Sequence, residues 1–213
     1  MADPLYSEIF FKGKKQAVVN FLNRGLKGER VSVQMNGEQI VKLLNDLKEN
    51  GIGMESYVPL PEIDIHDKEQ LIAGTNWCYE HYGCRGPMPF DKWQLLYDQD
   101  DMLCLITLLE TPAAAPIPFL KFINGLDGIT VYAYGFDDCT CPSWYQYNGR
   151  KDEVVWKDAL EDPKFEEYKE VLKTQEDYNP NTVDSETEYK VLEGYVKDLL
   201  KELNESFLEN KHK

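Results

Sequence analysis

The order of apolar patterns along the first three quarters of the chain constrains its fold more than any single motif does. Short runs of aromatic and β-branched residues predict strands, whereas apolar residues three and four positions apart predict helices. The first half of this pattern predicts a strand at 6–11, a helix at 18–26, a short strand at 31–35 and a second helix at 40–47. Val58–Glu62 is then predicted to be extended, because each proline excludes helical geometry from the residue before it.

The second half of the pattern predicts a hairpin, a helix, a strand and another hairpin. Polar residues 98–101 form the loop of the first hairpin, and Asn148-Gly149, a strong turn dipeptide, joins the strands of the last one. The helix begins with two prolines, which a first turn tolerates because its amides have no intrahelical partner. The predicted elements are strands at 93–97 and 102–109, a helix at 117–126, a strand at 129–134 and a hairpin at 144–147 and 154–156.

Strand, helix, strand, strand, helix, strand is the element order of a ferredoxin-like fold. We therefore predict an α+β protein in which residues 1–158 form a ferredoxin-like antiparallel sheet with helices on one face and a helical insert at about 36–85. Residues 159–213 are rich in Glu and Lys, and we expect them to form an acidic helical C-terminal extension packed on this domain. Its second helical pattern places apolar residues on one stripe: Tyr189, Leu192, Val196, Leu199, Leu203 and Phe207.

The formal net charge of the chain is −15, and the acidic excess lies after residue 57. Proteins that bind DNA or RNA through phosphate contacts need clustered Lys and Arg, so we expect no direct nucleic-acid binding. An alternative is that the acidic surface mimics the charge of a nucleic acid. No apolar run reaches the ~20 residues that cross a bilayer, and the N-terminus lacks a secretory pattern. We expect a cytoplasmic protein that does not bind membranes.

The five cysteines are an odd number in a chain without an export pattern, which indicates reduced thiols rather than a disulfide framework. Cys78, His81 and Cys84 are three residues apart, and together with Cys139 and Cys141 they could supply four ligands to zinc. A second hypothesis pairs His81 with one thiol as an activated nucleophile. Neither cysteine group has zinc-ribbon spacing, and cysteine is common as a buried apolar residue. We favour packed thiols, and predict no metal, no cofactor and no catalytic residue.

Other chemical signatures do not occur in the sequence. There is no Gly-rich phosphate loop, and acidic pairs such as Asp100-Asp101 and Asp137-Asp138 lie in predicted turns, where Asp is favoured. The enzyme hypothesis that remains is one built on the Cys78, His81 and Cys84 cluster, with or without zinc.

The segment Trp77–Arg85 gathers aromatic residues, two thiols, a histidine and a turn glycine after the proline-rich stretch Val58–Glu62. Two predicted strands and a Pro116-Ile117-Pro118 helix start follow it. Over about residues 5–155, this arrangement resembles the YubB-type ferredoxin-like family, which is carried by plasmids and phages and found in bacterial genomes. The positions that fit the family pattern directly are Trp77, Gly83, Pro116 and Pro118.

Four positions in the same segment differ from the family pattern. Tyr82 and Arg85 are conservative replacements for its Trp and Lys, whereas His81 and Cys84 stand where the family has Asn and Thr. The resemblance implies a fold and a bacterial mobile-element setting, and it implies no particular reaction.

Aromatic residues are unusually dense in the predicted strands and in Trp77–Arg85. Because side chains alternate across a strand, half of them can fill the core while the others face outward unless the C-terminal helices cover them. Aromatic and Arg side chains dominate protein interfaces. We therefore predict a non-enzymatic protein-interaction module that binds a protein partner or self-associates. Its predicted binding residues are Trp77, His81, Tyr82 and Arg85, with Trp77 and Tyr82 as apolar anchors and Arg85 as a polar one.

Overall fold

A computed structural model describes residues 4–47, 51–112, 114–137 and 143–158, together with the single positions 163, 170 and 201. The chain divides into two compact units, one made of residues 1–137 and 145–155 and the other of 138–144 and 156–213. The described residues have α+β architecture, with helices and a six-stranded sheet. The predicted C-terminal extension lies outside the described residues apart from the three single positions, and so do Cys139 and Cys141.

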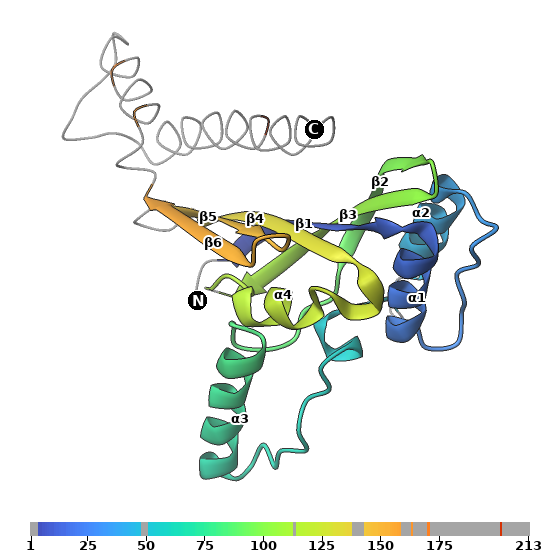
Figure 1. The fold of residues 1–213 in the computed structure, drawn as a ribbon. Helices are drawn as coiled ribbons and strands as arrows, with labels where there is room; N and C mark the ends of the chain where they lie inside the picture. The colour runs from blue at the N-terminus through green and yellow to red at the C-terminus, as the bar shows by residue number, and fades with distance from the viewer. Residues whose placement is uncertain are drawn as a thin grey trace, which may run out of the picture. The chain divides into compact units, whose positions relative to one another are not determined.

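The sheet has the strand order β2-β3-β1-β4-β5-β6 (Figure 1). Strand β1 lies between β3 and β4 and is antiparallel to both, so that Phe10 is opposite Ile106 on one side and Tyr132 on the other. Strand β2 is antiparallel to β3 and forms one edge. The strands are β1 (Pro4–Lys14), β2 (Asp91–Gln99), β3 (Met102–Pro112), β4 (Thr130–Asp137), β5 (Ser143–Asn148) and β6 (Glu153–Asp158).

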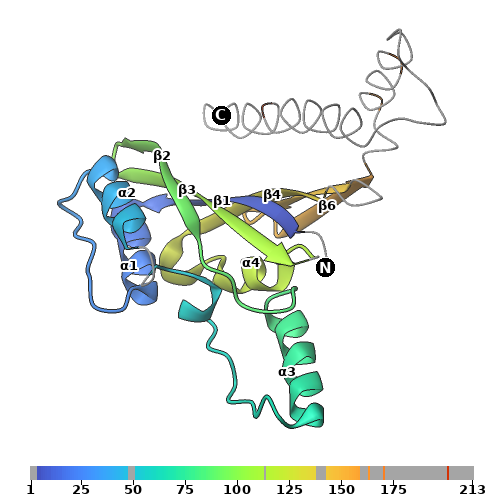
Figure 2. The same cartoon turned by 180° about the vertical axis from the view of Figure 1, so that it is seen from behind.

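Helices α1, α2 and α4 lie on the same side of the sheet, whereas α3 projects away from it (Figures 1 and 2). The strands and helices predicted around 6–26, 40–47, 93–134 and 144–156 are confirmed, with ends that differ by a few residues. The helices are α1 (Lys15–Gly25), α2 (Gly37–Asp46), α3 (Lys68–His81) and α4 (Ile117–Ile123), and two 3₁₀ turns occur at η2 (Met54–Ser56) and η3 (Leu126–Gly128).

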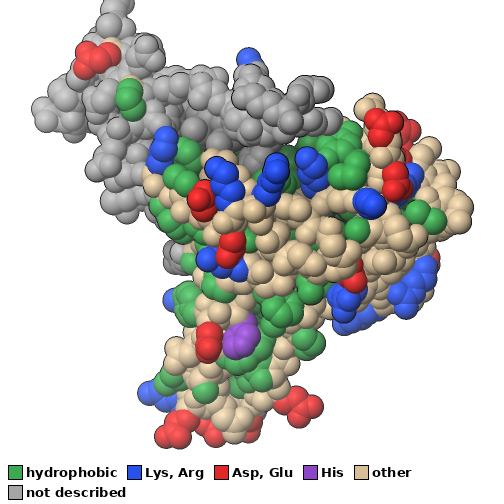
Figure 3. Space-filling view, viewed as in Figure 1, with side chains coloured by type: hydrophobic (Ala, Val, Ile, Leu, Met, Phe, Trp, Pro, Cys, Tyr) green, Lys and Arg blue, Asp and Glu red, His purple; other side chains and the backbone are tan. Residues whose placement is uncertain are grey.

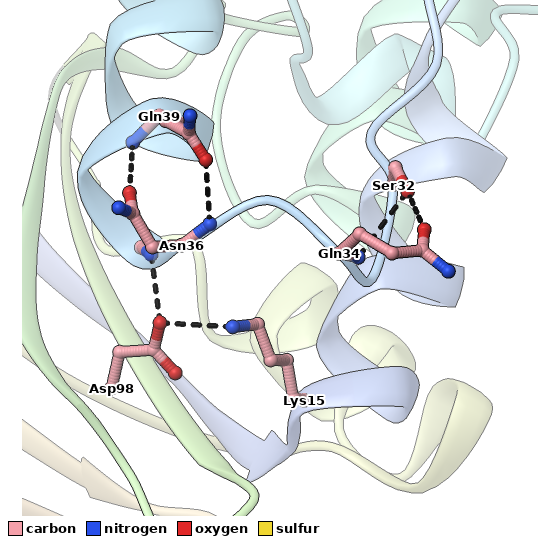
Figure 4. Close-up of polar contacts among 7 residues, drawn as sticks. Lys15, Ser32, Gln34, Asn36, Gln39 and Asp98 are labelled. Carbon is pink, nitrogen blue, oxygen red and sulfur yellow. Dashed lines mark hydrogen bonds and ion pairs between the residues drawn. The ribbon is translucent and has the colours of Figure 1, made fainter.

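The strand predicted at 31–35 is wrong, because the segment is a turn. The side chain of Asn23 accepts a hydrogen bond from the Val31 amide at 2.8 Å and donates one to the Val31 carbonyl at 2.9 Å, so the groups that a strand would pair are already satisfied. Ser32 donates to the side chain of Gln34, and this contact fits a turn. Figure 4 shows these two side chains facing each other across the turn.

The core lies between the sheet and the helices. Alternate residues of β1, namely Leu5, Ile9 and Phe11, face α1 and α4 and are fully or almost fully buried. The ring of Phe11 lies 4.9 Å from that of Phe21, which stacks on Tyr57 at 4.5 Å. This aromatic cluster continues through Phe90 and Phe119 to the end of α3, and it thereby fixes where α3 leaves the body.

One carboxylate joins three elements at the end of the β2–β3 hairpin (Figure 4). Asp98 of β2 accepts hydrogen bonds from the ammonium group of Lys15 at 2.9 Å and from the amide of Gly37 at 2.8 Å. Gly37 is the first residue of α2, so Asp98 also complements the positive end of that helix. Asn36 and Gln39 complete a capping box at the same place, which explains why α2 begins there.

Candidate interaction surface around helix α3

Helix α3 has a defined start and a defined end. Asp67 caps it by accepting hydrogen bonds from the amides of Glu69 and Gln70 at 2.9 and 3.2 Å. Gly83 ends it with a φ of +82°, a conformation that glycine adopts without strain. A Cβ at Gly83 would lie 2.6 Å from Pro118 and 2.7 Å from the Ala115 carbonyl oxygen. The end of α3 therefore packs directly against the start of α4.

Tyr82, one of the predicted apolar anchors, belongs to the core. Its side chain is fully buried, its hydroxyl donates to the Val58 carbonyl, and its ring meets Trp77 and Phe119 edge-on at 5.4 and 6.4 Å. Burial raises the pKa of the Tyr82 phenol. Tyr82 consequently positions α3, and its side chain is inaccessible to a partner.

Trp77 and His81 form a partly buried pair on one side of α3. Their rings stack with centroids 4.1 Å apart and an interplanar angle of 13°. The Nδ1 atom of His81 lies 2.9 Å from the Trp77 carbonyl oxygen, to which it donates, so Nε2 is the nitrogen that can accept a hydrogen bond. Arg85, beyond the helix end, is exposed. Three of the four predicted binding residues thus reach the surface to different extents.

The thiols of this segment are packed. Cys78 and Cys84 are buried, and Cys84 donates a hydrogen bond to the Gly86 carbonyl oxygen at 3.1 Å. Burial raises the pKa of the Cys84 thiol to about 11 and also raises the pKa of Cys78, so both thiols are protonated at neutral pH. Cys78 and His81 lie on α3, whereas Cys84 follows the helix end.

Metal ligands do not converge in the part of the chain that the structure describes. Within residues 4–47, 51–112, 114–137 and 143–158, no group of three or more His, Cys, Asp or Glu side chains is placed to hold an ion. The stacking of His81 on Trp77 gives the imidazole a different role, which is to pack along α3.

The sequence analysis missed an apolar surface on the other side of α3. Leu71, Ile72 and Tyr79, the α3 outer stripe, are 48%, 52% and 41% exposed. At 3.6 residues per turn they lie within an arc of about 100°, and Trp77 and His81 lie on the opposite side. Figure 3 shows apolar side chains beside a histidine on the lower part of the molecule, where Figure 1 places α3. The sequence contains a signal for this surface: Asp67 can cap a helix, and the apolar residues Ile72 and Tyr79 follow Leu71 by one and eight positions, which places all three on one side of that helix.

The residues before α3 explain why it projects. Gly74 is buried against Ile63 of the preceding segment, and a Cβ at Gly74 would lie only 2.1 Å from the Ile63 side chain. The helix is therefore supported by its own leading segment on one side and by α4 at its C-terminal end. Ile65, in the turn that leads into the helix, is 70% exposed.

A surface pocket of about 240 Å³ is lined by residues of the segments 51–56 and 87–89 together with Lys27. Segments 52–54 and 88–90 are joined there by backbone hydrogen bonds, from Met54 to Met88 at 3.0 Å and from Phe90 to Ile52 at 2.9 Å. Glycine, proline and methionine supply most of the wall, and Lys27 and Glu55 add charges of opposite sign. Specific small-molecule sites depend on a few polar groups that point at the same ligand. The two charged side chains of this wall have opposite signs, so they do not define a ligand of one charge.

Comparison of the chain with protein-family models, with curated proteins and with solved structures finds no match. None of the helices in the described ranges combines the length and the apolar character that crossing a bilayer requires.

Proposed function

We propose that this protein is a non-enzymatic interaction module that binds a protein partner through α3 and the residues that follow it. The observation that carries this proposal is the exposure of Leu71, Ile72 and Tyr79 on a helix that projects from the body. Apolar side chains gathered on one side of a protruding element are characteristic of recognition surfaces. The capped start and packed end of α3 present them without a cost of ordering the helix.

The scaffold of this module is ferredoxin-like in our proposal. The order β2-β3-β1-β4, with β1 antiparallel to both of its neighbours, supports this assignment, since a split β-α-β unit inserts its third strand beside the first. The proposed cytoplasmic location and bacterial mobile-element setting rest on the sequence resemblance and charge alone.

The predicted binding residues take different parts in this proposal. Arg85 is exposed and remains a polar contact for a partner, and Trp77 and His81 border the surface as a stacked pair. Tyr82 acts indirectly, because its buried ring and its hydrogen bond to Val58 hold the end of α3 in place.

The two alternatives remain predictions with less support. An enzyme that uses Cys78 or Cys84 needs a thiolate, whereas burial raises the pKa of both thiols. A nucleic-acid mimic needs a regular array of carboxylates, and it draws its support from the net charge of −15 alone.

Site-specific photo-crosslinking of the full chain tests the interaction module. A photoreactive amino acid is placed at Asn76, which is exposed on α3, and, as a matched control, at Asn20, which is exposed on α1. In an extract of the native host we expect a discrete crosslinked protein from position 76 and none from position 20. No crosslink from position 76, or the same product from both positions, would overturn the proposal.

A further inference from the structure

We infer that the α3 outer stripe docks an amphipathic helix with basic flanks that belongs to a partner protein. This inference rests on the proposed function and specifies the partner. It starts from the dimensions of the stripe: Leu71 and Tyr79 are eight residues apart, which at 1.5 Å per residue is about 12 Å along the helix. That length corresponds to about two turns of a helix that packs lengthwise against α3.

The residues between the apolar side chains favour a helix as the occupant. Thr75 and Asn76 lie one turn from Leu71 and Ile72 respectively, and both are smaller than the residues of the stripe. Large side chains separated by small ones form the ridges and grooves into which the side chains of a second helix fit. The preceding turn adds the exposed Ile65 near the free end of α3.

The charges beside the stripe indicate which charge the partner helix carries next to its apolar face. Glu69 and Glu80 are exposed and eleven residues apart, which places them about 20° from each other on the same flank. The segment before the helix adds the acidic residues Asp64 and Asp67, whereas Lys68 and Arg85 are the two Lys or Arg residues between Leu60 and Asp91. Opposite charges across an interface favour the correct partner and raise the association rate. The partner helix is therefore expected to carry Lys or Arg beside its apolar face.

A second copy of this chain fits the stripe poorly. In a two-fold pair the same surface meets itself, and when the two α3 helices run antiparallel the flank of Glu69 and Glu80 would face the same flank of the other copy. The basic stretch 12–30 is also unsuited, because among the described residues it exposes no large apolar side chain. The segment 158–213 carries a net charge of about −8, so it would also meet the acidic flank with like charge.

Binding of a defined peptide to the full chain tests the inference. The probe is a fluorescein-labelled peptide of roughly 18 residues, long enough to be helical, with Leu on one face and Lys on both flanks. Its controls are the same peptide with Glu on the flanks and a scrambled Leu/Lys sequence. Fluorescence anisotropy is expected to show saturable binding of the Lys-flanked peptide alone, weaker as salt is raised because exposed charges are screened.

Variants of the chain then locate the binding. Leu71→Gln together with Ile72→Gln is expected to weaken peptide binding about tenfold or more, and Glu69→Lys with Glu80→Lys to weaken it and reduce its salt dependence. Phe122→Gln, which changes an equally exposed apolar residue on α4, should leave binding unchanged. Circular dichroism verifies that α3 persists; if the double variant loses helix, Tyr79→Ser serves as the second test of the stripe.

Several outcomes would overturn the inference. These are no binding of the Lys-flanked peptide, equal binding of the scrambled peptide, and equal weakening by Phe122→Gln. Sedimentation of the chain as a dimer that Leu71→Gln and Ile72→Gln dissociate would identify a second copy as the occupant. If crosslinking at Asn76 captures a partner while the peptide does not bind, the proposed function stands and the basic helix is rejected. If both experiments fail, both proposals fall.

Discussion

At the scale of the residue, Gly83 fixes the junction between α3 and α4. Gly83→Ala places a side chain at a φ of +82° and a Cβ 2.6 Å from Pro118 and 2.7 Å from the backbone oxygen of Ala115. Strain and overlap act together, so we expect the free energy of unfolding to fall by about 2–4 kcal/mol. Urea denaturation followed by circular dichroism measures the change.

Two other glycines separate these contributions. Gly28 has a φ of +101° but open space around it, so Gly28→Ala reports strain alone, about 1 kcal/mol. A Cβ at Gly86 also meets open space, and no left-handed φ is found there, so Gly86→Ala should change stability by less than about 0.5 kcal/mol. Equal stabilities of the Gly83 and Gly86 variants would contradict the close approach of α3 to Pro118.

Asp127 is a second residue with a testable effect on stability, and its effect depends on pH. Arg24 holds the Asp127 carboxylate through two hydrogen bonds of 2.9 and 2.8 Å, and these lower the pKa of Asp127 from its ordinary value of 3.8. A carboxylate with a lowered pKa in the folded state stabilises that state above its ordinary pKa, and the stabilisation is lost as the pH falls through the lowered value.

Asp127→Asn preserves the residue shape at a positive φ of 53° and removes the charge. We expect the variant to be less stable than the wild type at pH 7 and equally stable at the low end of the acid titration. The thermal midpoints of both proteins between about pH 7 and pH 2 test this. The effect is expected to be small, because the Arg24 side chain is 53% exposed. A constant difference at every pH would mean that the ion pair is not its cause.

At the scale of the element, the edge strand β2 is paired by a side chain in place of a further strand. Asn45 of α2 donates to the Trp93 carbonyl oxygen and accepts from the Trp93 amide, both at 2.9 Å. Asn45→Ala leaves both groups without this partner, and we expect a loss of about 1–2 kcal/mol in the free energy of unfolding. Asn45→Asp keeps the acceptor and loses the donor, so it should be intermediate. A loss as large for Asn20→Ala, at an exposed position of α1, would show that the effect is not specific to the edge.

The elements differ in how far the sequence predicts them. Strand β3 and helix α2 are predictable because each buries one regular set of apolar residues. Helix α3 falls within the helical insert predicted at about 36–85, but its bounds were not predicted, since its apolar residues lie on two sides and follow no single stripe. The burial of Gly74 and Tyr82 depends on their contacts with Ile63, Val58 and Phe119. Those contacts join distant segments, and periodicity within a window contains no information about them.

At the scale of the whole molecule, the succession of strands and helices was predictable, whereas the order of strands in the sheet needed the pairing of β1 with β3 and β4. The pairing places Phe11 of β1 beside Phe21, Phe90 and Trp93, and so gathers residues that are up to 82 positions apart into one cluster. α3 ends on this cluster. We therefore expect unfolding of the core to expose the thiols of Cys78 and Cys84 at the same time as the thiol of Cys104 in the sheet.

Thiol labelling tests this coupling in the full chain. Cys78 of α3, Cys84 beyond it and Cys104 of β3 are buried in different elements. With Cys139→Ser and Cys141→Ser to remove the other two thiols, we expect none of the three to react with a disulfide reagent at pH 8 while the protein is folded. All three should react across one denaturant transition that coincides with the loss of circular dichroism, as in a two-state unfolding.

The pH dependence of the same variant gives the sign of the effect. The pKa of Cys84 is about 11 in the folded chain against an ordinary value of 9.0, so the folded state retains its proton after the unfolded state has lost it. Stability is therefore complete below about pH 9 and declines as the pH rises towards 11. A thiol that reacts in the folded protein and titrates below its ordinary range would contradict this packing. It would also favour a thiolate enzyme over the interaction module.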